Sequence, residues 1–441
     1  MAERRLIGAE EARSRAASLR EAGRALSERP ISEVVAAVAE ACARWADPSD
    51  PGRRAGVDAL ADHFGVPPSA VEPVLEAAFP RWSEPALLDW IEGELGDVGA
   101  LDGFVPLGGT ARRAIPPRIL VVLAARGVPT TPVADLLSGL CVGAATWVKP
   151  ASGADDLVRR FADTVAEIDP EVGEAVETAG WSREREEVGR AVLGEAETVV
   201  ATGDRSTMER IRAAVPPETR LVLHGPRMSV AILTREAIDG QREAAIGALA
   251  DDAAFSGQLG CLSPVVAYVE APKHAVDELA APVRAACEER WPAPARREAD
   301  AAERAKWAEW TTLASVEAAA GAGGAVAGGA DAAWTVRVGS GGGAPEPPPV
   351  PRALVLVPVD SAEEVAERCA RRRGGIATVG VAGGTGERIE ALAPALAAAG
   401  VERVCRLGEM QRPPLAWRRD GRPTLGDLVR WVDLEGRESP P

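Results

Sequence analysis

The chain has 441 residues, which is too long for one compact core and predicts two domains or more. Its formal net charge of −16 argues against a nucleic-acid partner, because binding to phosphates requires a basic surface. The long apolar segments are interrupted by Gly, Pro or charge and no apolar leader follows Met1, so we expect a cytoplasmic protein without membrane insertion.

Residues 1–95 are predicted to form an N-terminal helical region. Apolar residues recur there at the spacing of one helix face, namely Ile31, Val34, Val38, Cys42 and Trp45. Residues 60–75 have the look of a helix-turn-helix, but neither Lys nor Arg occurs between Ala55 and Pro80. A packed helical hairpin is therefore favoured over a DNA-binding motif.

Residues 96–226 alternate short apolar runs with helical stretches. Strands are expected at 118–125, 145–150, 198–203 and 220–225, with helices up to about 140, over about 155–168 and over about 206–215. This alternation predicts parallel βαβ units in a doubly wound sheet. Ligands of such sheets bind at the carboxyl ends of the strands, where Lys149, Thr202, Gly203 and His224 are expected.

Residues 227–412 form a second α/β block. Its expected elements are strands at 228–233, 263–270, 334–338, 352–359, 375–384 and 401–408, a helix to about 254 and a long helix over about 272–297. Two glycine-rich stretches, 321–330 and 339–351, are expected to be loops beside the short strand WTVRV. Residues 413–441 are expected to form a Trp- and Arg-rich tail.

The six cysteines are scattered without a CxxC pair, and the three histidines lie far apart in the sequence. This spacing favours neither a disulfide framework nor a metal site. We expect the thiols to be mostly buried, with one of them reactive.

Cys261 is the best candidate for a reactive thiol. It lies in FSGQLGCLSPVVAYVE (255–270), after a glycine-containing turn and directly before an apolar strand. Rigid structure can hold a thiol at such a junction while it faces a cleft, and cysteine is a good nucleophile toward thioesters. Taken alone, a single loop cysteine is more often structural.

The segment GQLGCLSP (257–264) resembles the nucleophile segment of aldehyde dehydrogenases, with one residue more between Gln258 and Cys261 than usual. The form Q-x-x-C-x-S-P and the stretch 404–435 (VCRLGEM to RWVDLE) are similar to LuxC-type acyl-CoA reductases, the reductase component of the bacterial fatty-acid reductase. The resemblance runs from about residue 104 to residue 435. It implies an α/β, aldehyde dehydrogenase-like fold with a Rossmann-type doubly wound NAD(P)-binding domain (96–226) and an α/β catalytic domain (227–412). It further implies NADPH-dependent reduction of an acyl-CoA, with a fatty acyl group expected, to the aldehyde through an acyl-enzyme on Cys261.

The resemblance also implies a cofactor site. Lys149 in ATWVKPAS, one of three lysines in the chain, is expected to bind the adenosine ribose, although a lone lysine is often only solvated. Ser152 stands where NAD-specific relatives carry Glu, and a serine can donate a hydrogen bond to a 2′-phosphate, so NADP(H) is favoured over NAD(H). Thr202 and Gly203 match the turn whose helix N-terminus faces the pyrophosphate, while Asp204 is either part of that turn or simply the helix N-cap.

Three further positions bear on the reaction. Leu223 replaces the Glu with which aldehyde-oxidising relatives activate water, so a thioester intermediate is expected to persist for acyl-CoA chemistry. His224 can serve as acid or base, or can only hydrogen-bond to the backbone. Gly127 replaces an Asn that supplies an oxyanion donor in the family, which leaves the Cys261 backbone N–H and Arg126 as candidate donors.

Two alternatives stay open at this point. One is an aldehyde dehydrogenase, CoA-dependent or simple, that works in the oxidative direction; the other is a non-catalytic subunit or scaffold with the same fold, which Gly127 keeps open. The expected partners are an acyl-CoA or acyl-carrier substrate, further copies of the chain, or acyl-transferase or synthetase subunits.

Overall fold

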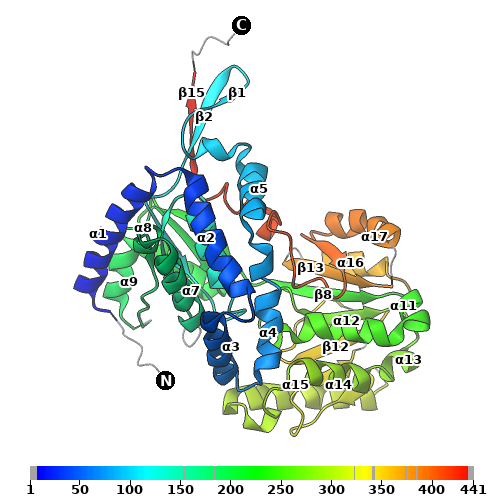
Figure 1. Ribbon diagram of the computed structural model, residues 1–441. Helices are drawn as coiled ribbons and strands as arrows, with labels where there is room; N and C mark the ends of the chain where they lie inside the picture. Colours follow the sequence, from blue (N-terminus) through cyan, green and yellow to red (C-terminus); the bar gives the residue numbers. More distant parts are fainter. Residues whose placement is uncertain are drawn as a thin grey trace. The chain divides into compact units, whose positions relative to one another are not determined.

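The structure, a computed structural model, describes residues 7–151, 155–182, 184–321, 323–339, 343–372, 375–383 and 386–435. These divide into two compact units. Unit 1 comprises Met1–Leu60, Leu75–Gly225 and Pro414–Pro441, and unit 2 comprises Ala61–Val74 and Pro226–Pro413. The elements of both units are labelled in Figure 1.

Unit 1 is built on a five-stranded parallel sheet in the order β5-β4-β3-β6-β7. Its strands are β3 (Ile119–Leu123), β4 (Ala145–Lys149), β5 (Val176–Glu177), β6 (Thr198–Thr202) and β7 (Arg220–His224). This order runs outward from β3 in both directions, as in a doubly wound sheet, so the predicted parallel βαβ arrangement is confirmed. The carboxyl ends of all five strands lie at the same edge.

The helices of unit 1 cover this sheet. They include α1 (Ala9–Leu26), α2 (Ile31–Ala46), α5 (Glu84–Leu95), α6 (Thr131–Leu140), α7 (Asp155–Ile168), α8 (Pro170–Glu174), α9 (Glu186–Leu193) and α10 (Arg205–Ala214). The predicted helical character of the N-terminal region is confirmed, and its first helices are part of unit 1: α1 contacts β3 and β4, and α2 contacts α6 and α7 (Figure 1). The segment 60–75 contains the end of α3 (Pro51–Phe64) and most of α4 (Pro68–Glu76), which form the predicted pair of helices.

Unit 2 is built on a seven-stranded sheet in the order β10-β11-β12-β9-β8-β13-β14, parallel except for the β10–β11 pair. Its strands are β8 (Met228–Leu233), β9 (Pro264–Val269), β10 (Val326–Ala327), β11 (Thr335–Val338), β12 (Ala353–Pro358), β13 (Ile376–Ala382) and β14 (Val404–Arg406). The central strands β8 and β13 are almost entirely apolar because both of their faces are buried. The accompanying helices are α11 (Arg235–Gly240), α12 (Arg242–Ala254), α13 (Lys273–Asp277), α14 (Ala280–Arg290), α15 (Ala301–Ala319), α16 (Glu364–Ala370) and α17 (Gly386–Ala398).

The predicted long helix over 272–297 is wrong. The chain forms α13 and α14 instead and leaves the helix after Arg290, because Pro292 and Pro294 cannot continue a helical hydrogen-bond ladder. The sequence reading also missed α15. This helix begins after Asp300, whose carboxylate accepts a hydrogen bond from the Glu303 N–H at 2.8 Å.

The segment expected to be a tail contains a strand. β15 (Arg430–Leu434) pairs antiparallel with β2 (Thr110–Ile115), which also pairs with β1 (Val105–Leu107) in a three-stranded sheet. The Gly108-Gly109 turn of the β1–β2 hairpin was the signal that the sequence reading overlooked. None of the helices in the described ranges is long and apolar enough to cross a membrane.

Candidate active site

A strained turn precedes Cys261 in unit 2. The 3-10 segment η3 (Phe255–Gln258) follows α12, and three successive residues in it are left-handed: Ser256 (φ 50°), Gly257 (φ 66°) and Gln258 (φ 65°). A Cβ atom on Gly257 would lie 2.9 Å from Nε1 of Trp291, so only glycine fits there. Left-handed Ser and Gln cost about 1 kcal/mol or more each, which indicates that surrounding contacts hold the turn in place.

Gln258 supplies two of these contacts. Its Nε2 donates to the Pro264 carbonyl at 3.1 Å, and its Oε1 accepts from the Ala353 N–H at 2.9 Å, so the buried amide joins the start of β9 to the start of β12. On the other side, Ser229 Oγ of β8 donates to the Cys261 carbonyl at 2.7 Å. The backbone at Cys261 is thus fixed by the sheet beneath it.

Cys261 is exposed, whereas the other thiols are shielded to different degrees. Burial raises the pKa of Cys405 to about 11 and keeps this partly exposed thiol protonated. The remaining four are buried: burial raises the pKa well above its ordinary value for Cys42 and to about 12 for Cys141, Cys287 and Cys369. Because the thiolate is the nucleophile, exposure favours Cys261 over the others as the reactive cysteine.

A buried carboxyl group supports the same region. Asp252 lies on α12, three residues before the turn, and is 1% exposed. It accepts backbone hydrogen bonds from Gly408 at 2.5 Å and Met410 at 3.0 Å, and Gln411 Nε2 contacts both the Asp252 carbonyl (2.8 Å) and Ser263 Oγ (3.4 Å). Burial raises the pKa of Asp252 to about 7, against the opposing effect of the Gly408 and Met410 N–H groups.

This raised pKa predicts a pH-dependent stability. The folded protein binds a proton at Asp252 more readily than the unfolded chain, so the resulting stabilisation is complete below about pH 4 and is lost as the pH rises through about 7. From pH 5 to pH 8 we expect the wild type to lose on the order of 2 kcal/mol relative to Asp252→Asn, which has no carboxyl to ionise. Melting temperatures of both proteins across this range measure the difference. Asp239→Asn, a change at an exposed carboxylate, is the control. If the difference in melting temperature between the wild type and Asp252→Asn stayed constant with pH, it would contradict the prediction.

Three of the predicted cofactor residues and the predicted catalytic residue His224 lie at the carboxyl edge of the unit 1 sheet. Lys149, Thr202 and His224 are the last residues of β4, β6 and β7, and Thr202 and His224 are neighbours across the β6–β7 pair. Gly203 follows Thr202, and its N–H donates to the His224 carbonyl at 3.2 Å. Ser152 lies outside the described residues.

Lys149 lies against an aromatic side chain. Its ammonium group is 5.3 Å from the centre of the Trp181 ring, a cation–π contact, and Trp181 packs edge-on against the buried Trp147. This contact holds the Lys149 side chain beside the end of β4.

Asp204 is the N-cap of α10. Its carboxylate accepts from the Thr207 N–H at 2.7 Å and from Ser206 Oγ at 2.9 Å, and these bonds lower the pKa of Asp204 to about 2. The helix N-terminus therefore already has a negative charge beside it. This arrangement opposes the binding of a phosphate at the same place.

The sequence reading missed a set of polar residues at this edge. In the 3-10 turn η5 (Arg419–Gly421), Arg419 Nη2 donates to Thr202 Oγ1 at 3.0 Å and its Nη1 to Asp135 Oδ1 of α6 at 3.5 Å. The Asp420 carboxylate lies 2.7 Å from His224 Nδ1. Arg419 and Asp420 lie in WRRDGRP, where only the Asp-Gly pair marks a turn and no local pattern indicates their partners.

The other three positions that the sequence analysis connected with the reaction, Leu223, Gly127 and Arg126, are also in unit 1. Leu223 is a β7 residue that pairs with Ala201, and it offers no proton acceptor. Gly127 and the exposed Arg126 lie in the loop between β3 and α6. Among the residues that the structure describes, there is no group of three or more His, Cys, Asp or Glu side chains that could hold a metal ion.

Comparison with known proteins agrees with this architecture. The NAD-dependent benzaldehyde dehydrogenase of Corynebacterium glutamicum superposes with a TM-score of 0.65 at 14% identity, over 98% of this chain and 91% of that one. The NADP-dependent glyceraldehyde-3-phosphate dehydrogenase of Bacillus halodurans does so with a TM-score of 0.67 at 13% identity, over 98% and 92%. These similarities establish the fold alone: an α/β aldehyde dehydrogenase-like fold with two parallel sheets, as predicted.

The sequence comparison is more specific. Residues 26–431 match the family described as "Acyl-CoA reductase (LuxC)", and the chain belongs to this family of oxidoreductases. The long-chain acyl-protein thioester reductase of Aliivibrio fischeri is 27% identical over 191 residues, 42% of this chain and 39% of that protein. The match thus spans about two fifths of the length of this relative.

Proposed function

We propose that this protein reduces an acyl thioester to the aldehyde with a nicotinamide cofactor, through an acyl-enzyme on Cys261. The observation that carries the proposal is the exposed thiol of Cys261 on a turn fixed by Gln258 and Ser229, in a chain that belongs to the acyl-CoA reductase family.

In the first step the Cys261 sulfur forms a bond to the thioester carbonyl carbon, and the bond from that carbon to the sulfur of CoA or of an acyl carrier breaks. The released thiolate takes up one proton. When bound, a reduced nicotinamide would supply the hydride that the acyl carbon takes up. The carbon–sulfur bond to Cys261 then breaks, which releases the aldehyde and restores the thiolate.

Lys149, Thr202 and Gly203 at the carboxyl edge of unit 1 are the residues proposed to bind the cofactor. A cation at the end of β4 and a hydroxyl at the end of β6, with β3 between these two strands, fit the hydroxyl and phosphate groups of a dinucleotide. The Asp204 carboxylate does not favour a phosphate directly at the N-terminus of α10. Ser152 remains the reason to propose NADP(H) rather than NAD(H).

Leu223 supports the reductive direction. An apolar side chain at the end of β7 cannot deprotonate a water molecule, so hydrolysis of the acyl-enzyme has no base there. An oxidative aldehyde dehydrogenase would need such a base at another position, or CoA as the acceptor.

The purified protein should form aldehyde from acyl-CoA and NADPH. We would offer a series of acyl-CoAs of increasing chain length, and the same acyl groups on a carrier protein, with NADPH or NADH, and trap the aldehyde as a hydrazone. A fatty acyl thioester with NADPH is expected to give the highest kcat/KM. No aldehyde from any donor with either cofactor would overturn the proposal.

Gly127 favours one other candidate, a non-catalytic subunit or scaffold, because it lacks the side-chain oxyanion donor of the family. Labelling with iodoacetamide separates the two. Selective alkylation of Cys261 that acyl-CoA suppresses supports the enzyme, whereas a Cys261 no more reactive than Cys405 supports the scaffold.

A further inference from the structure

The chain around Cys261 forms a loop that a distant residue of the same unit closes. This loop, residues 252–263, contains the nucleophile and the strained turn η3. The Nε2 group of Gln411 donates to the Asp252 carbonyl at 2.8 Å and to Ser263 Oγ at 3.4 Å. Asp252 is the first residue of the loop and Ser263 is the last, so one amide joins the two ends. All of these residues belong to unit 2.

The orientation of the Gln411 amide is fixed by its partners. The Asp252 carbonyl can only accept a hydrogen bond, so the NH₂ side of the amide must face it. The NH₂ group has two N–H bonds, which is one for each partner. Asp252 and Ser263 are each 1% exposed, so water competes little for either acceptor. An apolar side chain of the same length at position 411 could not form this bridge.

The segment that presents this amide is itself anchored to the sheet. The Asp252 carboxylate accepts hydrogen bonds from the Gly408 and Met410 N–H groups. Arg403, directly before β14, donates to the Met410 carbonyl at 2.7 Å. The Met410 side chain is fully buried against Gly380 of β13, where a Cβ atom would lie 2.5 Å from its sulfur. The amide therefore projects from a segment that is fixed to β13 and β14.

We infer that Gln411 is a positioning residue for Cys261, because it holds both ends of the loop from which the thiol projects. The inference rests on the proposed function, in which the sulfur must meet the thioester carbonyl carbon at a defined distance and angle. A displacement of about 1 Å from such a geometry can cost about a hundredfold in rate. Ser229 holds the Cys261 carbonyl within the loop, and Gln411 adds the closure at the ends.

The test is Gln411→Met, which keeps the length of the side chain and removes both N–H donors. We expect kcat for aldehyde formation to fall roughly tenfold to a hundredfold, while the KM values for acyl-CoA and NADPH stay within about twofold of the wild type. Gln241→Met makes the same change at an exposed glutamine and should retain wild-type kcat. Melting temperatures show whether each variant is folded under the assay conditions.

Hydrogen exchange provides a readout that does not depend on activity. Amides of residues 255–263 should exchange at least about fivefold faster in Gln411→Met than in the wild type, while those of β8 and β12 are unchanged. Unchanged exchange in the loop, or wild-type kcat in Gln411→Met, would overturn the inference. A wild-type protein that forms no aldehyde from any donor, together with faster loop exchange in Gln411→Met, would refute the proposed function instead, and the closure of the loop by Gln411 would stand.

Discussion

Cys261→Ala should form aldehyde at least about a thousandfold more slowly than the wild type, because removal of a covalent nucleophile leaves only substrate binding and orientation. Cofactor binding should persist, since the residues proposed for it lie in unit 1 and Cys261 belongs to unit 2. Aldehyde trapping measures the first effect, and the shift in melting temperature with NADPH measures the second.

Cys405→Ala is the matched control for this experiment. Its thiol is partly exposed on β14, and its raised pKa keeps it protonated at neutral pH, so the variant should reduce thioesters as fast as the wild type. Aldehyde formation by Cys261→Ala at the control rate would rule out the covalent mechanism.

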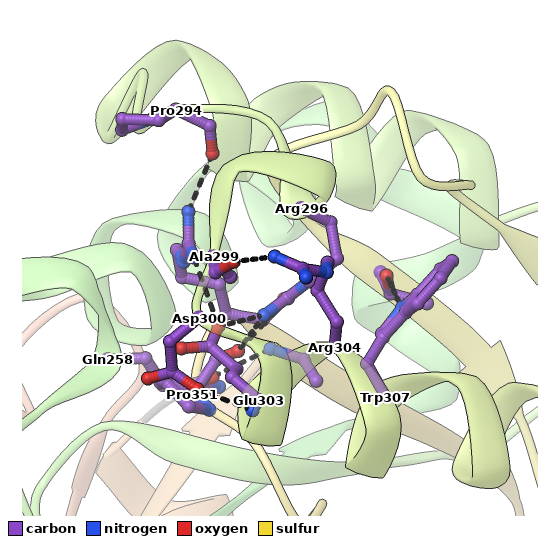
Figure 2. A network of polar contacts seen from close by, with 12 residues as sticks. Gln258, Pro294, Arg296, Ala299, Asp300, Glu303, Arg304, Trp307 and Pro351 are labelled. Atoms are coloured by element: carbon purple, nitrogen blue, oxygen red, sulfur yellow. Dashed lines mark hydrogen bonds and ion pairs between the residues drawn. The ribbon is translucent and has the colours of Figure 1, made fainter.

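Arg296→Met should lower the free energy of unfolding by about 3–5 kcal/mol, the usual cost of removing one member of a buried charged network. Arg296 is fully buried. Its guanidinium donates to the Glu303 carboxylate at 2.8 Å and the Pro351 carbonyl at 3.0 Å, and to the Arg352 carbonyl at 2.9 Å. Figure 2 shows Arg296 with Glu303 and Pro351. Burial, with the charge of Arg352, lowers the pKa of Arg296 to about 10, so the group is still a cation at neutral pH.

The neighbouring Arg297→Met provides the comparison. Arg297 is 61% exposed and pairs with Asp331 on the surface, so its loss should change the free energy of unfolding by less than about 1 kcal/mol. Urea denaturation followed by tryptophan fluorescence measures both variants. Equal losses for Arg296→Met and Arg297→Met would show that the buried network does not stabilise unit 2.

The Arg296 network also bears on the nucleophile turn. It binds the carbonyl groups of Pro351 (labelled in Figure 2) and Arg352, and the next residue, Ala353, donates its N–H to Gln258. We therefore expect Arg296→Met to reduce turnover at temperatures where the variant is still folded.

The sequence predicted the sheets well because parallel strands buried on both faces are almost entirely apolar, as in MSVAIL (228–233), where only Ser229 is polar. The expected helix over 155–168 also agrees with α7. The prediction of helices was weaker where single residues, such as prolines and N-caps, decide where a helix begins and ends. Neither α14 nor α15 has a strong apolar periodicity, so the pattern of residues defined neither helix: the predicted helix ran past Pro292 and Pro294, and α15 was missed.

The candidate site was predicted only in part for a related reason. Topology alone brings Lys149, Thr202 and His224 to one edge, since strands that run in the same direction end together. The contacts of Arg419 and Asp420 depend on how a distant segment returns to the sheet, and no local pattern encodes that path. The three left-handed residues before Cys261 could not be predicted either, because only Gly257, which lacks a side chain, is of a residue type that signals such a backbone.

The pairing of β15 with β2 has a consequence for synthesis on the ribosome. Leu434 pairs with Ala111, Glu94 accepts the N–H groups of Thr424, Leu425 and Gly426, and Arg220 donates to the Asp427 carbonyl. Unit 1 therefore begins to emerge first but cannot be completed until residues 414–434 have been translated, whereas unit 2 has all of its strands by residue 406. During that interval the β2 edge of the β1–β2 hairpin is unpaired in the nascent three-stranded sheet, and chaperone protection would matter most at this stage.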